Sequence, residues 1–200
     1  MRIIASLAIL ACLAGNPAVL AEEVTASDTT TTTVKPKPPA ALRAEELDTL
    51  FAQLHAEGAE ARASGVEKKI WANWGRSDSI TAEVLLGQAS RAMNAQEFPV
   101  AEEILDRLLI ARPEYAEAWN RRATLNFMAQ RYEKSLADID KVLELEPRHF
   151  GALSGRGMIY EALDKPDEAL SAYRDALAVN PHMQAVKEKV KQLEKLRPDI

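Results

Sequence analysis

The sequence predicts an all-α protein built from stacked helical hairpins. Pro113, Pro147 and Pro181 lie at a constant step of 34 residues (147 − 113 and 181 − 147). Within each step, two stretches carry apolar residues at helical spacing, and a short turn divides them. One helical hairpin cannot bury its apolar face alone, so each unit needs a neighbour. A repeated hairpin of this kind therefore predicts a stack of three units.

Two kinds of residue recur at the same step and indicate how the hairpins pack. The small residues belong where two helices cross closely, and the large apolar residues fill the space between successive hairpins. The proline at the end of each unit ends the second helix. The small columns are Ala89, Ala123 and Gly157, and Ala101, Ser135 and Ala169; the large ones include Leu85, Trp119 and Leu153.

These columns resemble the tetratricopeptide repeat, which has an aromatic residue or Leu early in its first helix, small residues at the crossings and a terminal proline. The resemblance covers about half of the chain and gives repeats at residues 82–115, 116–149 and 150–183. The run from Ala116 to Ile159 is also similar to short exported repeat proteins of Gram-negative bacteria. The resemblance implies a solenoid fold and a periplasmic location.

Segments on both sides of the repeats complete the predicted fold. Residues 41–81 resemble a degenerate fourth hairpin, with amphipathic stretches at Leu42–Ser64 and Val66–Trp74. Gly58 and Gly65 would weaken its helices by about 1 kcal/mol each if they lie in helix interiors. Residues 184–200 form a capping helix and tail, because an apolar stripe backed by lysines and glutamates suits the end of a stack.

The N-terminal 40 residues predict export. Residues 1–21 have a basic start, an apolar run too short to span a bilayer, and small residues before Glu22, as in a cleaved signal peptide. An uncleaved segment that anchors the chain in a membrane is the alternative. Residues 22–40 are rich in Thr and Pro and predict a disordered linker. The only cysteine, Cys12, lies inside the predicted signal peptide.

Composition and spacing argue against chemistry in the repeats. A formal net charge of −5 disfavours binding to nucleic acid or an anionic membrane. His55, His149 and His182 are far apart in the sequence, and the last two fall at junctions between hairpins, where capping or solvent exposure is expected. The glycines at 155 and 157 lack the strand and third glycine of a phosphate loop. We therefore expect no catalytic residue, cofactor or metal site.

The first helices of the repeats are expected to line a concave groove. Asn120 would pair with a peptide backbone, Arg121 would meet a carboxylate, and Gly151 and Gly155 would let a ligand chain approach closely. The strongest candidates for contact with a partner are Asn120, Arg121, Thr124, Met128, Ser154 and Met158. Further groove-facing candidates are Glu83, Leu86, Gly87, Ser90, Glu117, Gly151 and Gly155.

The repeat proteins that clamp chaperone tails carry basic residues and Asn at positions where this chain has Leu86, Ser90, Gly151 and Gly155. The resemblance therefore does not imply a chaperone-tail partner. It implies a non-enzymatic periplasmic scaffold that binds a partner protein or peptide in its groove, in envelope assembly or maintenance. The alternative is a structural subunit of an envelope complex that uses its convex face or its N-terminal helices, with Trp71 and Trp74 exposed as the contact.

Overall fold

The computed structural model describes residues 37–196, and every regular element in that part of the chain is an α-helix. The predicted signal peptide, nearly all of the linker and the last four residues lie outside the described residues. The helices are α1 (Pro39–Leu54), α2 (Glu60–Trp74), α3 (Ile80–Asn94), α4 (Phe98–Ala111), α5 (Ala116–Met128), α6 (Tyr132–Leu145), α7 (Phe150–Ala162), α8 (Pro166–Val179) and α9 (Gln184–Leu196).

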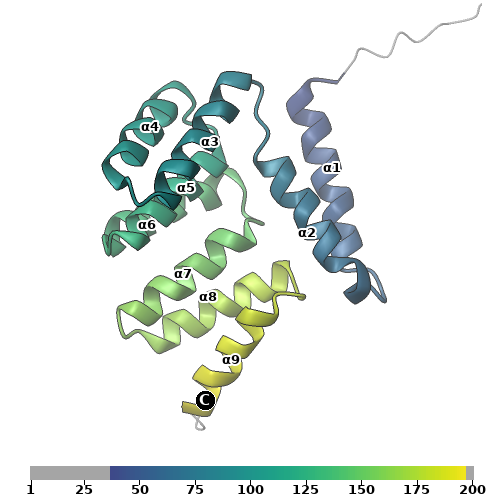
Figure 1. The fold of residues 1–200 in the computed structure, drawn as a ribbon. Coiled ribbons are helices and arrows are strands. Elements are labelled where there is room, and N and C mark those ends of the chain that lie inside the picture. The colour runs from purple at the N-terminus through teal and green to yellow at the C-terminus, as the bar shows by residue number, and fades with distance from the viewer. Residues whose placement is uncertain (1–36, 197–200) are drawn as a thin grey trace, which may run out of the picture. The chain divides into compact units, whose positions relative to one another are not determined.

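Helices α3 to α8 form three successive hairpins, and α9 packs on the last of them (Figure 1). The first helix of every hairpin ends in the same way. Gln96, Gln130 and Asp164 occupy equivalent positions and have φ values of 60°, 56° and 55°. In each turn the next residue donates its backbone N–H to a carbonyl five residues earlier, as Arg131 does to Asn126 at 2.8 Å. The 34-residue period is therefore visible in the backbone itself.

The small residues lie where two helices of a hairpin meet, as predicted. A Cβ atom added to Gly157 would lie 2.5 Å from Cε1 of Tyr173, a fully buried ring on α8. Ala123, its equivalent in the second repeat, is buried, and its carbonyl accepts a hydrogen bond from Ser135 Oγ at 2.7 Å. Each hairpin thus closes around a position that has no room for a large side chain.

Ion pairs at a 34-residue step join successive repeats. Arg122 on α5 pairs with Asp106 on α4 at 2.8 Å, and Arg156 on α7 pairs with Asp140 on α6 at 2.6 Å. Arg122 also reaches Asp138 of its own repeat at 2.7 Å. These arginines connect the first helix of one repeat to the second helix of the repeat before it.

The N-terminal hairpin is present, but its predicted break was wrong. Its turn lies at residues 55–59, where Gly58 has a φ of 68°, and Gly65 lies inside α2. A positive φ suits glycine and stops a right-handed helix, so Gly58 sets the boundary that the sequence placed near Gly65. Helix α1 begins at Pro39, slightly before the predicted end of the linker.

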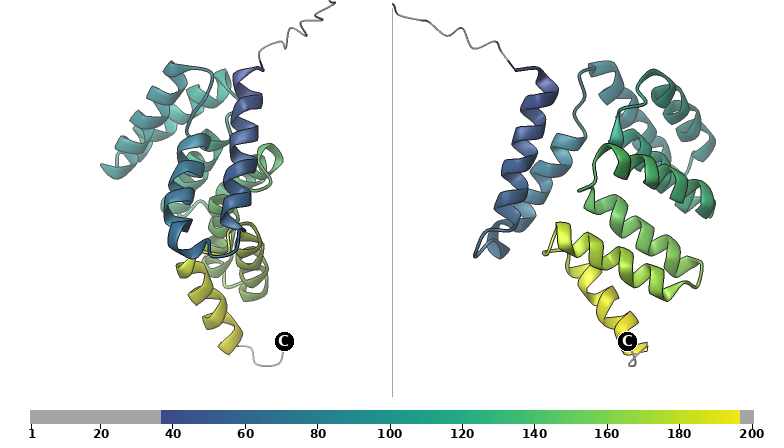
Figure 2. Two further views of the ribbon diagram at one scale, coloured as in Figure 1. Left: turned by 90° about the vertical axis from the view of Figure 1, so that its right-hand side faces the viewer. Right: turned by 180° about the vertical axis from the view of Figure 1, so that it is seen from behind.

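This hairpin packs against the junctions between repeats (Figures 1 and 2). Its buried cluster includes Phe150 at the start of α7 and, among the described residues, none from α3 or α4. Equivalent residues at the three junctions contact it: the Tyr115 hydroxyl donates to the Gly75 carbonyl, the His149 ring stacks on Trp74 at 4.0 Å, and Met183 packs on the cluster. The hairpin thus bridges all three repeats.

Candidate functional site

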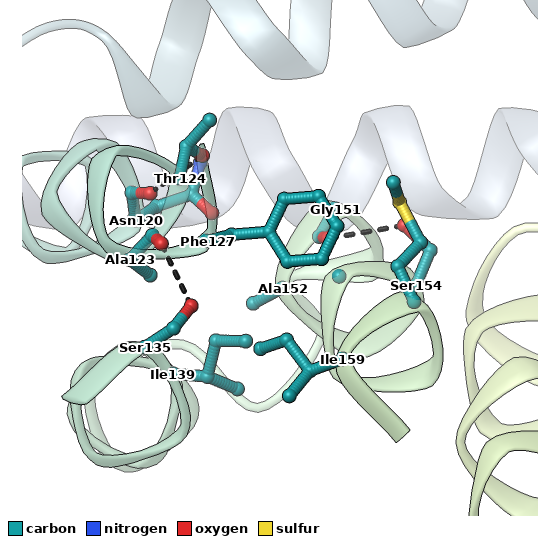
Figure 3. Close-up of a pocket in the computed structure, with 12 residues that line it drawn as sticks. Asn120, Ala123, Thr124, Phe127, Ser135, Ile139, Gly151, Ala152, Ser154 and Ile159 are labelled. Atoms are coloured by element: carbon teal, nitrogen blue, oxygen red, sulfur yellow. Dashed lines mark hydrogen bonds between the residues drawn. The ribbon is translucent and has the colours of Figure 1, made fainter. Parts of the chain in front are cut away.

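A pocket of about 150 Å³ opens between the first helices of the second and third repeats. Helix α5 contributes Asn120, Thr124 and Phe127 to its wall, and Ile139 of α6 lies next to Ile159 below them in the view of Figure 3. Helix α7 supplies the opposite wall, from Gly151 to Ile159. We call this space the repeat pocket.

Two glycines open the repeat pocket. Gly151 and Gly155 occupy the positions that Glu117 and Arg121 hold in the second repeat. In the second repeat those side chains form an ion pair at 2.7 Å across one helical turn. In the third repeat the Trp71 ring packs on Gly151, whereas the space at Gly155 is open, since a Cβ atom added there would only touch Ile139 at 3.7 Å. The pocket therefore follows from a departure of the third repeat from the second.

Four of the six predicted contact residues line the repeat pocket: Asn120, Thr124, Ser154 and Met158. The hydroxyl of Thr124 donates to the Asn120 carbonyl, and that of Ser154 to the Gly151 carbonyl, both at 3.0 Å. The Asn120 amide donates to Glu117 at 3.0 Å. Met158 is 46% exposed. Most of the accessible lining is therefore apolar.

Arg121 and Met128 do not line this pocket. The guanidinium of Arg121 is held by Glu117, whose carboxylate is almost completely buried. The chain thus supplies one carboxylate to Arg121 itself, and contact of Arg121 with a ligand carboxylate stays a prediction. Met128 is exposed at the end of α5.

Glu117 belongs to a buried polar network at the second junction. His149 Nε2 lies 3.2 Å from Glu117, and Nδ1 accepts the Ala152 backbone N–H at 3.1 Å. Nε2 therefore carries the ring proton and donates it to the carboxylate. Of the two roles expected for His149, capping is confirmed and solvent exposure is not, since the ring is fully buried beneath Trp74.

A second pocket adjoins the first and shares Phe127, Ser154 and Met158 with it. Its remaining wall comes from Tyr173 on α8 and from Val186 and Lys189 on α9, among others. We call it the end pocket. The sequence reasoning missed its α9 residues, because that helix was interpreted only as a cap. Phe127 was also missed, although it follows Thr124 by three residues and so lies on the same helix face.

Three further expectations about exposed residues were wrong. Trp74 is only 7% exposed, whereas Trp71 is exposed as expected, although its ring also packs edge-on against His149 and Phe150. The close approach expected at Gly151 is made by Trp71 itself, since an added Cβ atom would lie 2.4 Å from that ring. Leu86, expected in the groove, is buried in the core of the first repeat.

Within residues 37–196, no group of three or more His, Cys, Asp or Glu side chains is placed to hold a metal ion. None of the helices described in that range has both the length and the apolar character needed to cross a membrane.

Comparison with known proteins identifies the family of this fold. Tetratricopeptide repeat models match residues 86–149 and 150–183. A TPR repeat-containing protein of Rhizobium etli is 40% identical over 149 residues, which cover 74% of this chain and 73% of that protein. The chain belongs to the tetratricopeptide repeat family. Sperm-associated antigen 1 of Mus musculus is 31% identical over 60% of this chain, but the match spans only 13% of that protein.

Solved structures show the same fold at low sequence identity. The first TPR of Spaghetti (RPAP3), bound to an HSP90 peptide, aligns with a TM-score of 0.56 at 21% identity and covers 60% of this chain and 94% of its own. MamA aligns with a TM-score of 0.55 at 18% identity and covers 82% of this chain and 87% of its own. The fold predicted from the sequence, an all-α tetratricopeptide solenoid, is confirmed.

Proposed function

We propose that this protein is a non-enzymatic interaction scaffold that binds a partner protein or peptide along α5, α7 and α9. The observation that carries the proposal is the repeat pocket, an accessible and largely apolar space beside the exposed Met158. Binding sites are commonly concave, apolar and lined by a few polar groups. The end pocket continues this surface over Val186.

Structural neighbours support a partner of this class. The Spaghetti domain holds an HSP90 peptide, and the TPR2B domain of yeast Sti1 is in complex with an Hsp70 peptide. We do not propose a chaperone tail for this chain. Leu86 is buried, and Gly151 and Gly155 carry no side chain that could hold a carboxylate.

The test is crosslinking in cells followed by mass spectrometry, with tagged wild-type protein and two variants. Met158→Glu places a charge between the two pockets and should abolish capture of the partner. Ile110→Glu is the matched control, because Ile110 is a highly exposed apolar residue on α4 that lines neither pocket. Equal capture by wild type and Met158→Glu, with both variants folded, would refute binding at this surface.

We further propose that the protein is exported and acts in the periplasm, in envelope assembly or maintenance. This proposal rests on the sequence of residues 1–21. Cell fractionation with N-terminal sequencing tests it. A periplasmic protein that starts at Glu22 is the expected result. A start at Met1 in the membrane fraction would show the uncleaved anchor instead, and a cytoplasmic protein would refute export.

A further inference from the structure

The polar groups of the two pockets are already engaged within the chain. Thr124 and Ser154 donate to carbonyls of their own helices, and the Asn120 amide donates to Glu117. In the end pocket, Glu161 accepts from the Tyr173 hydroxyl and pairs with Lys189 at 3.0 Å. The hydroxyl protons of Thr124 and Ser154 are therefore used within the chain, which leaves few free donors for the C=O groups of a ligand, and the opposite charges of Glu161 and Lys189 are paired.

An extended peptide on such a surface would leave backbone groups without hydrogen-bond partners. Each of its buried N–H and C=O groups needs a partner, and one left unpaired costs about 1–3 kcal/mol. An α-helix satisfies these groups internally and presents only side chains. A charged ligand group would likewise have to displace an existing ion pair. The chemistry of the lining thus favours an uncharged helical face.

The shape of the surface agrees with a helix as the occupant. Gly155, Met158 and Ala162 follow one another at spacings of three and four residues, so they lie along one face of α7. Small residues let two helices approach to about 8–10 Å between axes. The repeat pocket has a volume of about 150 Å³. A cavity of roughly that volume holds one benzene molecule, which matches a single Phe or Leu side chain.

We propose that the repeat pocket and the end pocket together bind one amphipathic helix of a partner protein. A Phe or Leu of that helix enters the repeat pocket, and apolar residues one and two turns away pack on Met158 and Val186. This inference rests on the proposed function, because it names the kind of partner that the same surface binds.

The experiment is a selection of random peptides of about 18 residues, roughly five helical turns, displayed against the full chain. The enriched peptides should carry Phe or Leu with further apolar residues at helical spacing. Synthetic copies are then titrated by fluorescence anisotropy. A proline at the centre of the peptide should weaken binding about tenfold or more, because it breaks the helix.

A matched pair of glycine variants locates the binding. Gly155→Leu fills the repeat pocket and should weaken the enriched peptides about tenfold. Gly87→Leu makes the same change at the equivalent position of the first repeat, where an added Cβ atom meets only the Arg91 side chain at 3.6 Å; it should leave binding unchanged. Circular dichroism melting confirms that both variants fold.

The outcomes separate this inference from the proposed function. Enriched peptides with proline-rich or acidic C-terminal patterns would overturn the helical partner, as would binding that survives the central proline or the Gly155→Leu change. So would a failure to enrich any peptide. In each of these cases the crosslinking of Met158→Glu in cells decides separately whether the surface binds a partner at all.

Discussion

The N-terminal hairpin and the first repeat are both helical hairpins, yet they are held in different ways. The first repeat packs along the helices of the second, from α4 to α5. The N-terminal hairpin lies instead against the junctions where one repeat passes to the next, and its contacts come from side chains such as Trp74, His149 and Met183. A hairpin that precedes a solenoid in the sequence is therefore not always its first repeat.

The first repeat itself shows why no hairpin stacks in front of it. Ala118 and Leu125 of the second repeat are buried against the first. Their equivalents in the first repeat are Val84, which is 50% exposed, and Arg91, which is exposed. Arg91 thus places a charge on the outer face of α3, at a position where a preceding repeat would need an apolar contact. The stack ends there.

The largest loss of stability is expected where the two helices of one repeat cross. Gly157→Val places a branched side chain against the fully buried Tyr173 ring, which an added Cβ atom would already approach to 2.5 Å. Overpacking should lower the free energy of unfolding by about 2–3 kcal/mol. Chemical denaturation measures this loss. An unchanged denaturation midpoint would show that α7 and α8 can separate freely at this crossing.

A second variant separates the N-terminal hairpin from the repeats. Gly151→Leu projects a side chain into the Trp71 ring, so we expect the ring to be displaced and the hairpin to detach at a cost of about 1–3 kcal/mol. Tryptophan emission should shift to longer wavelength, and proteolysis within residues 75–79 should accelerate. Gly155→Leu, one turn further along α7, is the control and should change neither signal. Detachment is disproved if Gly151→Leu matches wild type in both.

The third prediction is a gain in stability, whereas the first two are losses. Gly65 lies inside α2, and no atom is within 4 Å of an added Cβ atom. Gly65→Ala should therefore raise the free energy of unfolding of the hairpin by up to about 1 kcal/mol through helix propensity alone. Hydrogen exchange of the α2 amides reports this local change. Slower exchange confirms it, whereas faster exchange would mean that the helix needs a glycine there.

The sequence predicted the repeats well because each repeat position occurs three times in the chain. The residues Ala89, Ala123 and Gly157 are all small because two helices cross closely there, and their regular spacing indicates this shared role. The N-terminal hairpin occurs once, so its break was assigned to the wrong glycine, and Trp74 was expected on the surface although it is buried. One feature of the sequence nevertheless indicated that the N-terminal hairpin does not stack in front of the first repeat. Arg91 occupies the position that Leu125 and Ile159 occupy in the later repeats.

The candidate site was predicted in part for the same reason. Asn120, Thr124, Ser154 and Met158 followed from repeat positions and do line the pocket. The ion pair between Arg121 and Glu117 was not predicted, because helix spacing permits it but does not decide it. The side chains that α9 contributes could not be assigned, because the resemblance treats that helix only as an end to the stack.

The smallest effect is expected from acid and should again distinguish the two regions. A hydrogen bond from Arg76 lowers the pKa of Glu46 below its ordinary value of 4.5, and one from Arg43 lowers the pKa of Asp78 below 3.8. Glu46 lies in α1 of the N-terminal hairpin, and Asp78 lies in the segment between α2 and α3. A carboxylate with a lowered pKa stabilises the fold above its ordinary pKa, and this contribution is lost as the pH falls through the lowered value.

Hydrogen exchange of α1 amides between about pH 6 and about pH 3, corrected for the intrinsic pH dependence of exchange, should therefore show the hairpin loosening at the acid end. The effect is small because both groups are exposed to solvent and screened by salt. A Glu46→Gln, Asp78→Asn double variant should already be loosened at neutral pH and respond less to acid. An acid response as large in the double variant as in wild type would assign the loosening to other carboxylates and leave these two ion pairs without a role in holding the hairpin.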